Sequence, residues 1–90
     1  MSNLKPEDIL GQNIRECRRN KGFSGSDLAS IICCSQQHIS RIESGSVRLN
    51  VSQIKYIADC LDTKVDSLIF GIGFQYEGLD NINLGKFYYF

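Results

Sequence analysis

The sequence predicts an all-α fold, a compact domain of five short helices followed by a short aromatic C-terminal tail. Helix-capping residues recur along residues 6–70, and the apolar residues between them are spaced three or four apart. No alternating strand pattern occurs before residue 71. Ninety residues suit one domain with a small core.

The first helix is predicted over residues 6–21. Pro6 stands at its start, two acids follow in the first turn, and cations lie in the last turn before Gly22. Acids suit the positive N-terminal end of a helix dipole and cations suit its C-terminal end. Leu10, Ile14 and Cys17 share one face of this helix.

Three further helices are predicted to begin at the capping residues Ser24, Ser35 and Asn50. Ser24 has Asp27 three residues later, which would complete a capping box. We expect these helices over residues 24–32, 35–44 and 50–61, and a short fifth helix over about 65–70. The residues expected to face the core from the second and fourth helices are Leu28, Ala29, Ile32, Ile54, Ile57, Ala58 and Leu61.

We predict a domain over residues 1–70 and a C-terminal tail over residues 71–90. The tail is rich in glycine and aromatic residues, and apolar residues alternate at 72, 74 and 76, which favours extended segments. It could cover one end of the core, form a dimer contact or be disordered. The candidate dimer residues are Phe74, Tyr76, Phe87, Tyr88, Tyr89 and Phe90.

The composition is that of an ordinary folded domain, with 42% hydrophobic and 22% charged residues. The sequence has neither an apolar run of membrane-spanning length nor a secretory signal, so we expect a cytoplasmic protein. The net charge is zero, but residues 1–50 hold seven Lys/Arg against five Asp/Glu and residues 51–90 hold three against five. This asymmetry permits a basic face in the first half.

The four cysteines, Cys17, Cys33, Cys34 and Cys60, do not have the spacing of a zinc site. We predict no metal and no cofactor, and interpret the thiols as buried core residues, with redox sensing or metal binding as the alternatives. The sequence has one histidine, no triad-like spacing and no phosphate-binding glycine loop. We therefore predict that the chain is not an enzyme.

The segment 35–44, SQQHISRIES, carries the strongest functional signal. On a helix, Ile39 and Ile42 share one face, while the opposite face holds amides, hydroxyls and a guanidinium but no acid. Glutamine matches the hydrogen-bonding edge of adenine and arginine that of guanine. Such a face could simply be solvated, but two short helices joined by a tight turn favour a helix-turn-helix that reads DNA. The residues of the polar face are Gln36, Gln37, Ser40, Arg41 and Ser44.

The segment 22–50 resembles the helix-turn-helix of the Cro/C1-type, phage-repressor-like regulators, and the resemblance extends over residues 10–69. The resemblance rests on Ala29, Ser35, Ile39–Ser40 and the Arg-Ile-Glu-x-Gly pattern at 41–45. The resemblance implies a transcriptional regulator that binds double-stranded DNA in a sequence-specific way as a homodimer. The sequence shows no membrane-spanning run and no evident ligand-sensing domain, so we expect no membrane partner and no small-molecule ligand.

The resemblance also implies individual roles. Gln36 and Gln37 would touch base edges, and Arg41 a base or a phosphate. Arg18 and Glu43 would form a buried structural ion pair. The family often has glutamine in place of Gly25, so here only the backbone amide of Gly25 could contact a phosphate. The family also often has glycine in place of Cys33, so we expect the turn at Cys33 to differ. The further expected contacts with DNA are Ser35, Ser40, Ser44, Ser46 and Arg48.

Three short patterns, Ser24-Gly25, SQQ at 35–37 and RLN at 48–50, also resemble the small regulators of bacterial fimbrial operons. The alternative function is an antitoxin or another protein-interaction module on the same fold, with the aromatic tail as the partner-binding segment. The sequence does not predict the operator, the target genes or whether transcription would be activated or repressed.

Overall fold

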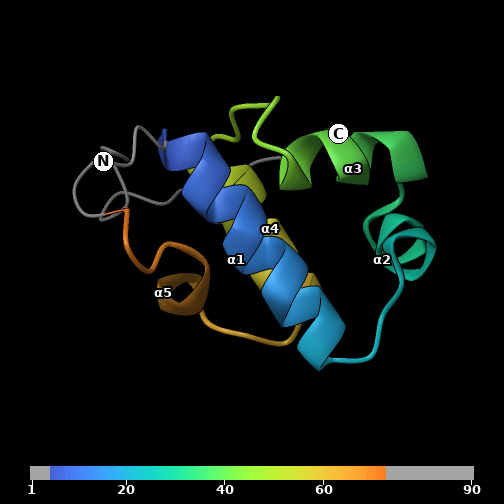
Figure 1. Ribbon diagram of the computed structural model, residues 1–90. Helices are drawn as coiled ribbons and strands as arrows, with labels where there is room; N and C mark the ends of the chain where they lie inside the picture. The colour runs from blue at the N-terminus through green and yellow to red at the C-terminus, as the bar shows by residue number, and fades with distance from the viewer. Residues whose placement is uncertain (1–4, 73–90) are drawn as a thin grey trace.

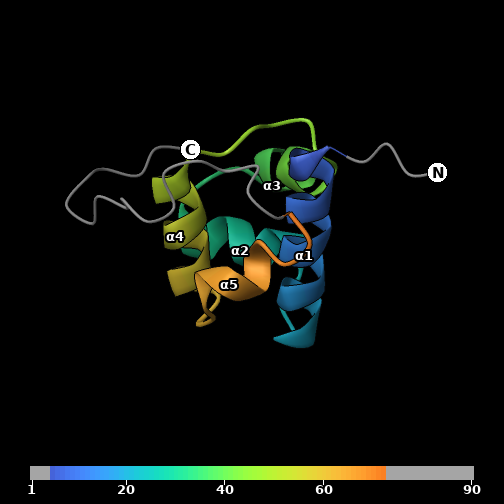
Figure 2. The ribbon, with the colours of Figure 1, turned by 90° about the vertical axis from the view of Figure 1, so that its left-hand side faces the viewer.

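The computed structural model describes residues 5–72 and shows five helices in that part of the chain, which confirms the predicted all-α fold. Figure 1 shows α1 running across the molecule in front of α4, with α3 along one end and α5 toward the other. Figure 2, turned by 90°, shows α1 and α4 on opposite sides of the molecule, with α3 above and α5 below. The helices are α1 (Pro6–Asn20), α2 (Gly25–Ile32), α3 (Gln36–Glu43), α4 (Val51–Cys60) and α5 (Val65–Leu68).

The predicted helix caps are confirmed by hydrogen bonds. The Ser24 hydroxyl accepts the N–H of Asp27 at 3.0 Å, and the Asp27 carboxylate accepts the N–H of Ser24 at 2.9 Å. Asn50 and Gln53 form the same reciprocal pair at 2.8 and 2.9 Å. Ser35 caps α3 through its hydroxyl. These bonds satisfy N–H groups that a helix leaves without partners at its start, so they fix where α2, α3 and α4 begin.

The core contains every residue predicted to point inward from the second and fourth helices. It also contains Leu49, from the connection before α4, and Ile72, which the sequence assigned to the tail. The Ile72 N–H donates to the carbonyl of Ile69 at 3.0 Å, and this turn returns the Ile72 side chain to the core. The buried apolar residues are Leu10, Ile14, Leu28, Ala29, Ile32, Ile39, Ile42, Leu49, Ile54, Ile57, Ala58, Leu61, Leu68 and Ile72.

The predicted extended segments and dimer residues of the tail lie outside the described residues. This applies to Phe74, Tyr76 and the four aromatic residues at 87–90. Their roles stay predictions.

The end of the described chain is held against α1 by one side chain. The Asn13 amide donates to the carbonyl of Leu68 at 2.8 Å and to the carbonyl of Phe70 at 2.9 Å. Both carbonyls follow the start of the single-turn helix α5, where backbone acceptors need partners outside the helix. Asn13 therefore fixes the position of the segment that carries Ile72 into the core.

Helix α1 crosses α3 at a buried glycine. A Cβ atom at Gly11 would lie 2.5 Å from the carbonyl oxygen of Ile42 and 2.6 Å from that of Glu43. Real Cβ atoms do not approach backbone oxygens this closely, so only glycine fits the crossing. Nothing in the local sequence pattern around Gly11 indicates which helix it will contact, so this role could not be predicted.

Arg18 and Glu43 form an ion pair between α1 and α3. Arg18 Nε donates to one Glu43 oxygen at 2.7 Å and Arg18 Nη2 donates to the other at 3.0 Å. Arg18 Nη1 donates to the carbonyl of Phe23 at 2.8 Å, and Arg15 Nε donates to Glu43 at 3.3 Å. The side chains of Arg18 and Glu43 are only 11% and 3% exposed. The hydrogen bonds with Glu43 raise the pKa of the Arg18 guanidinium, which therefore stays charged.

The prediction that the thiols are buried core residues is wrong for Cys33 and holds only in part for the other three, which pack against the core without being fully buried. Cys33 is exposed, and Cys17, Cys34 and Cys60 are half-buried. The reason is their position: Cys33 and Cys34 lie in the turn after α2, and Cys60 is the last residue of α4, where the chain turns toward the surface. Partial burial raises the pKa of Cys34 and of Cys60 above the ordinary thiol value.

The expectation that Cys33 would change the turn between α2 and α3 is also wrong. Cys33 adopts the left-handed conformation, with φ 71° and ψ 48°. Its N–H and that of Cys34 both donate to the carbonyl of Ala29, at 2.8 and 2.9 Å. These two bonds complete the end of α2. The turn therefore keeps the left-handed geometry that glycine would favour, despite the steric cost of the cysteine Cβ atom.

Replacing Cys33 with glycine is expected to raise the free energy of unfolding by about 1 kcal/mol, because glycine adopts the left-handed conformation without the steric cost of a Cβ atom. Urea denaturation measures the change. Cys34→Gly is the matched control: among the described residues only Cys33 and Asp62 are non-glycine residues with positive φ, so the control should lose stability. A Cys33→Gly protein no more stable than the wild type would contradict strain at this turn.

Replacing Glu43 with glutamine is expected to lower the free energy of unfolding by about 3–5 kcal/mol, because it leaves the buried guanidinium of Arg18 without a counter-charge. The matched control is Asp59→Asn, which breaks the exposed Lys55–Asp59 pair, 2.6 Å long, and should cost less than about 1 kcal/mol. Chemical denaturation of both variants gives the comparison. Equal losses in the two would show that burial of the Arg18–Glu43 pair adds nothing.

Candidate nucleic-acid interface

Helix α3 exposes one polar face at an end of the molecule. Ile39 and Ile42 are each 2% exposed and pack into the core, as their spacing predicts. The exposed residues of α3 and of the connection over residues 44–50 include no acid, since Glu43 is buried. The predicted site residues that are exposed here are Gln36, Gln37, Ser40, Arg41 and Ser44.

Two other segments lie at the same end as α3. Figures 1 and 2 both show the N-terminal end of α1 and the connection between α3 and α4 beside it. The connection, residues 44–50, holds the predicted site residues Ser46 and Arg48, and both are exposed. The fold therefore places most of the predicted site on one continuous end of the domain.

Gly25 and Gln36 come together from two different helices. A Cβ atom at Gly25 would lie 3.8 Å from both Cγ and Nε2 of Gln36. Gly25 is the first residue of α2, and Gln36 is the first residue of α3. The first N–H groups of a helix have no acceptor within it and attract anions. The start of α2 thus adds potential backbone donors beside the amide of Gln36.

The serines of the interface are partly engaged in local structure. The Ser35 hydroxyl accepts the N–H of His38 at 3.0 Å, which leaves its own O–H as a donor. Ser44 Oγ donates to the carbonyl of Arg41 at 3.1 Å and lies 3.0 Å from Ser46 Oγ. These contacts order the end of α3 and the start of the following connection.

Arg48 forms an ion pair with a residue that the sequence analysis did not single out as a partner. Its Nη1 lies 2.6 Å from Oε2 of Glu7, in the first turn of α1. The Arg48 side chain is 58% exposed, whereas that of Glu7 is 14% exposed. A backbone hydrogen bond at the start of α1 and, next, the bond from Arg48 lower the pKa of Glu7. The two residues are 41 positions apart, so no local pattern indicates the pair.

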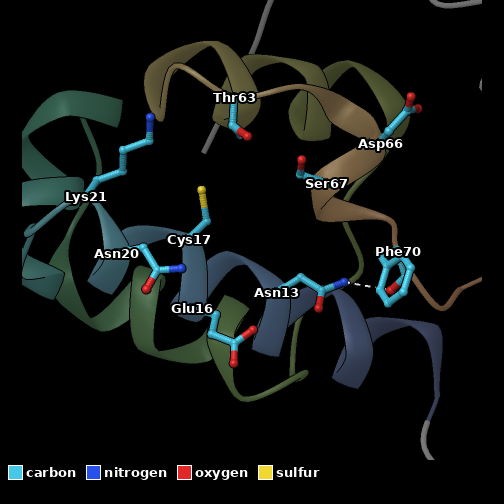
Figure 3. A pocket seen from close by; sticks show the side chains of 9 residues that line it. All are labelled: Asn13, Glu16, Cys17, Asn20, Lys21, Thr63, Asp66, Ser67 and Phe70. Carbon is cyan, nitrogen blue, oxygen red and sulfur yellow. Dashed lines mark hydrogen bonds between the residues drawn. The ribbon is translucent and has the colours of Figure 1, made fainter.

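A separate groove of about 670 Å³ lies between α1 and the segment around α5. Figure 3 shows Asn13 and Cys17 of α1 facing Ser67 and Phe70, with the Asn13–Phe70 hydrogen bond at one end. Most of the residues that line it are polar, and the Phe70 side chain at its edge is 79% exposed. None of the predicted DNA-binding residues lines it.

The described residues contain neither a candidate metal site nor a candidate membrane span. Within residues 5–72, no three or more His, Cys, Asp or Glu side chains are grouped so that they could hold a metal ion. No helix in this range has the length and apolar character needed to cross a membrane.

Comparisons with known proteins identify the family. A family model described as a helix-turn-helix domain matches residues 9–68. An uncharacterized HTH-type transcriptional regulator of Rickettsia prowazekii is 30% identical over 79 residues, covering 88% of this chain and 55% of that protein. This chain therefore spans little more than half the length of that relative.

Two solved structures are similar in fold. The hypothetical transcription factor NHTF from Neisseria has a TM-score of 0.68 at 26% identity, covering 73% of this chain and 76% of its own. The master regulator for biofilm formation SinR, solved in complex with DNA, has a TM-score of 0.62 at 27% identity, covering 68% and 98%. Because the family model spans the packed helices from α1 to α5, this chain belongs to the helix-turn-helix family of the Cro/C1 type.

Proposed function

We propose that this chain is a sequence-specific, DNA-binding transcriptional regulator that places α3 in the major groove. The observation that carries the proposal is the exposed, acid-free polar face of α3, held from behind by two buried isoleucines and by Glu43. A helix of this size fits the major groove, where the edges of all four base pairs are distinguishable. The similarity to SinR, which was solved with DNA bound, supports the same role.

The residues nearest the start of α3 would read the bases. Gln36 and Gln37 each carry a donor and an acceptor in one plane, which matches the edge of adenine. Arg41, one helical turn after Gln37, would contact guanine or a phosphate. Ser40 lies on the same exposed face and would donate to a phosphate.

A second group of residues would position the domain on the DNA backbone. The N–H groups at the start of α2, including that of Gly25, would meet one phosphate. Ser35, Ser44, Ser46 and Arg48 would contact the flanking backbone. Such contacts set the register of the protein on the duplex but do not read its sequence.

The chain would act as a homodimer on two half-sites about one helical turn apart, roughly 34 Å. One domain with a helix as short as α3 contacts few base pairs, so a second copy would double the sequence that is read. The aromatic residues of the tail, at 74, 76 and 87–90, would supply the dimer contact. The division into a domain and a tail, the cytoplasmic location and the narrower resemblance to fimbrial regulators remain predictions.

Selection from a pool of random DNA duplexes at low and moderate salt tests the function. Enrichment of a symmetric site, with half-sites about one turn apart, would establish a dimeric reader of sequence. Binding that weakens steeply with salt but enriches no site would mean contact with phosphates only. No binding at either salt concentration would contradict the proposal and favour a protein-interaction module on this fold.

Replacing Gln37 with alanine is expected to lower the preference for the selected site at least about fivefold, because a bidentate base contact contributes about 1–3 kcal/mol of discrimination. Fluorescence anisotropy with the selected and a scrambled duplex measures this ratio. Gln12→Ala, at an exposed glutamine of α1, is the matched control and should leave it unchanged. If Gln37→Ala kept the full preference without a change in melting temperature, Gln37 would not read bases as proposed.

A further inference from the structure

The proposed DNA-binding end of the domain contains an acid that faces one of its cations. Glu7, in the first turn of α1, lies 2.6 Å from the guanidinium of Arg48 in the connection after α3. Arg48 is one of the two exposed arginines in or directly after α3, the other being Arg41. A carboxylate at this place reduces the positive potential that phosphates would meet.

Glu7 is held in place by α1. Its side chain is only 14% exposed and accepts a hydrogen bond of 2.6 Å from Arg48 Nη1. The neighbouring acid, Asp8, has a different partner: it accepts the N–H of Lys5 at 3.0 Å and caps the helix. Of these two acids of the first turn, it is therefore Glu7 that pairs with Arg48.

We propose that Glu7 limits the affinity of this chain for DNA by offsetting the charge of Arg48. The proposal rests on the DNA-binding function proposed above. A phosphate that contacts Arg48 either replaces the Glu7 carboxylate or shares the guanidinium with it, and both cost free energy that an unopposed arginine would not require. Glu7 acts through Arg48 and is a positioning residue rather than a DNA contact.

The effect has a distinct signature, because contacts with phosphates carry no sequence information. Removing the carboxylate should strengthen binding to every duplex by the same factor and leave the ratio between selected and random duplexes unchanged. It should also release about one more counterion on binding, which steepens the slope of log K against log salt by about 0.9. A purely structural role of Glu7 would change neither slope nor affinity in this way.

The test is a double-mutant cycle of Glu7→Gln and Arg48→Ala, with binding measured against the selected duplex and a random-sequence duplex over a range of salt. Glu7→Gln should bind both duplexes about fivefold more tightly at low salt, the upper range for one exposed ion pair. Arg48→Ala should weaken binding less than about twofold in the wild type but about fivefold in the Glu7→Gln background. Melting temperatures show that each variant is folded.

Asp59→Asn is the matched control. This substitution also removes one carboxylate from an ion pair of 2.6 Å. Asp59, however, lies near the end of α4, whereas Glu7 pairs with an arginine of the connection after α3. Equal tightening in Asp59→Asn and Glu7→Gln would show an effect of net charge alone and overturn the inference, as would weaker binding by Glu7→Gln. Tightening that persists without Arg48 would overturn the pairing. Absence of binding to any duplex by the wild type would instead refute the proposed function itself.

Discussion

The close crossing of α1 and α3 is the constraint on which the rest of the structure depends. Gly11 allows the α1 backbone to lie against the carbonyls of Ile42 and Glu43, where any side chain would collide. Because the two helices lie this close together, the Arg18 guanidinium forms a bidentate contact with the Glu43 carboxylate. Ile39 and Ile42 then enter the core, and the polar side of α3 faces outward. The orientation of the proposed reading face therefore follows from contacts on the other side of the helix.

The Arg18–Glu43 pair contributes orientation more than net stability. Apolar residues that fill the same volume often stabilise a protein as well as a buried ion pair does, because desolvation offsets the attraction between the charges. The guanidinium, however, fixes directions: it binds Glu43 of α3 through two nitrogens and the carbonyl of Phe23, just before α2, through the third. One side chain of α1 thus fixes the positions of the start of α2 and the end of α3 relative to α1. Apolar contacts, which lack direction, would fix these positions less precisely.

The residues alone predicted features that depend on neighbours in the chain. Of the contacts between distant residues, the Arg18–Glu43 pair was expected only from the family resemblance, and two others were missed. The caps at Ser24, Ser35 and Asn50 and the inward face of α4 follow from spacings of three and four, and all are present. The close approach at Gly11 and the Glu7–Arg48 pair join segments about 30 to 40 residues apart, and no local pattern encodes them. Cys33 shows a third case, because hydrogen bonds at the end of α2 override a residue preference at the turn.

The distribution of charge at the α3 end fits a protein that reads bases with neutral groups. The chain as a whole has no net charge, and the start of α3 exposes two amides rather than cations. Amide contacts discriminate between bases, whereas cations attract every phosphate alike. A domain whose arginine after α3 is opposed by Glu7 relies less on attraction to the backbone, so a larger share of its binding free energy comes from contacts that depend on sequence. Because non-specific sites in a genome far outnumber the specific one, weakening the sequence-independent part reduces the fraction of protein held away from its target.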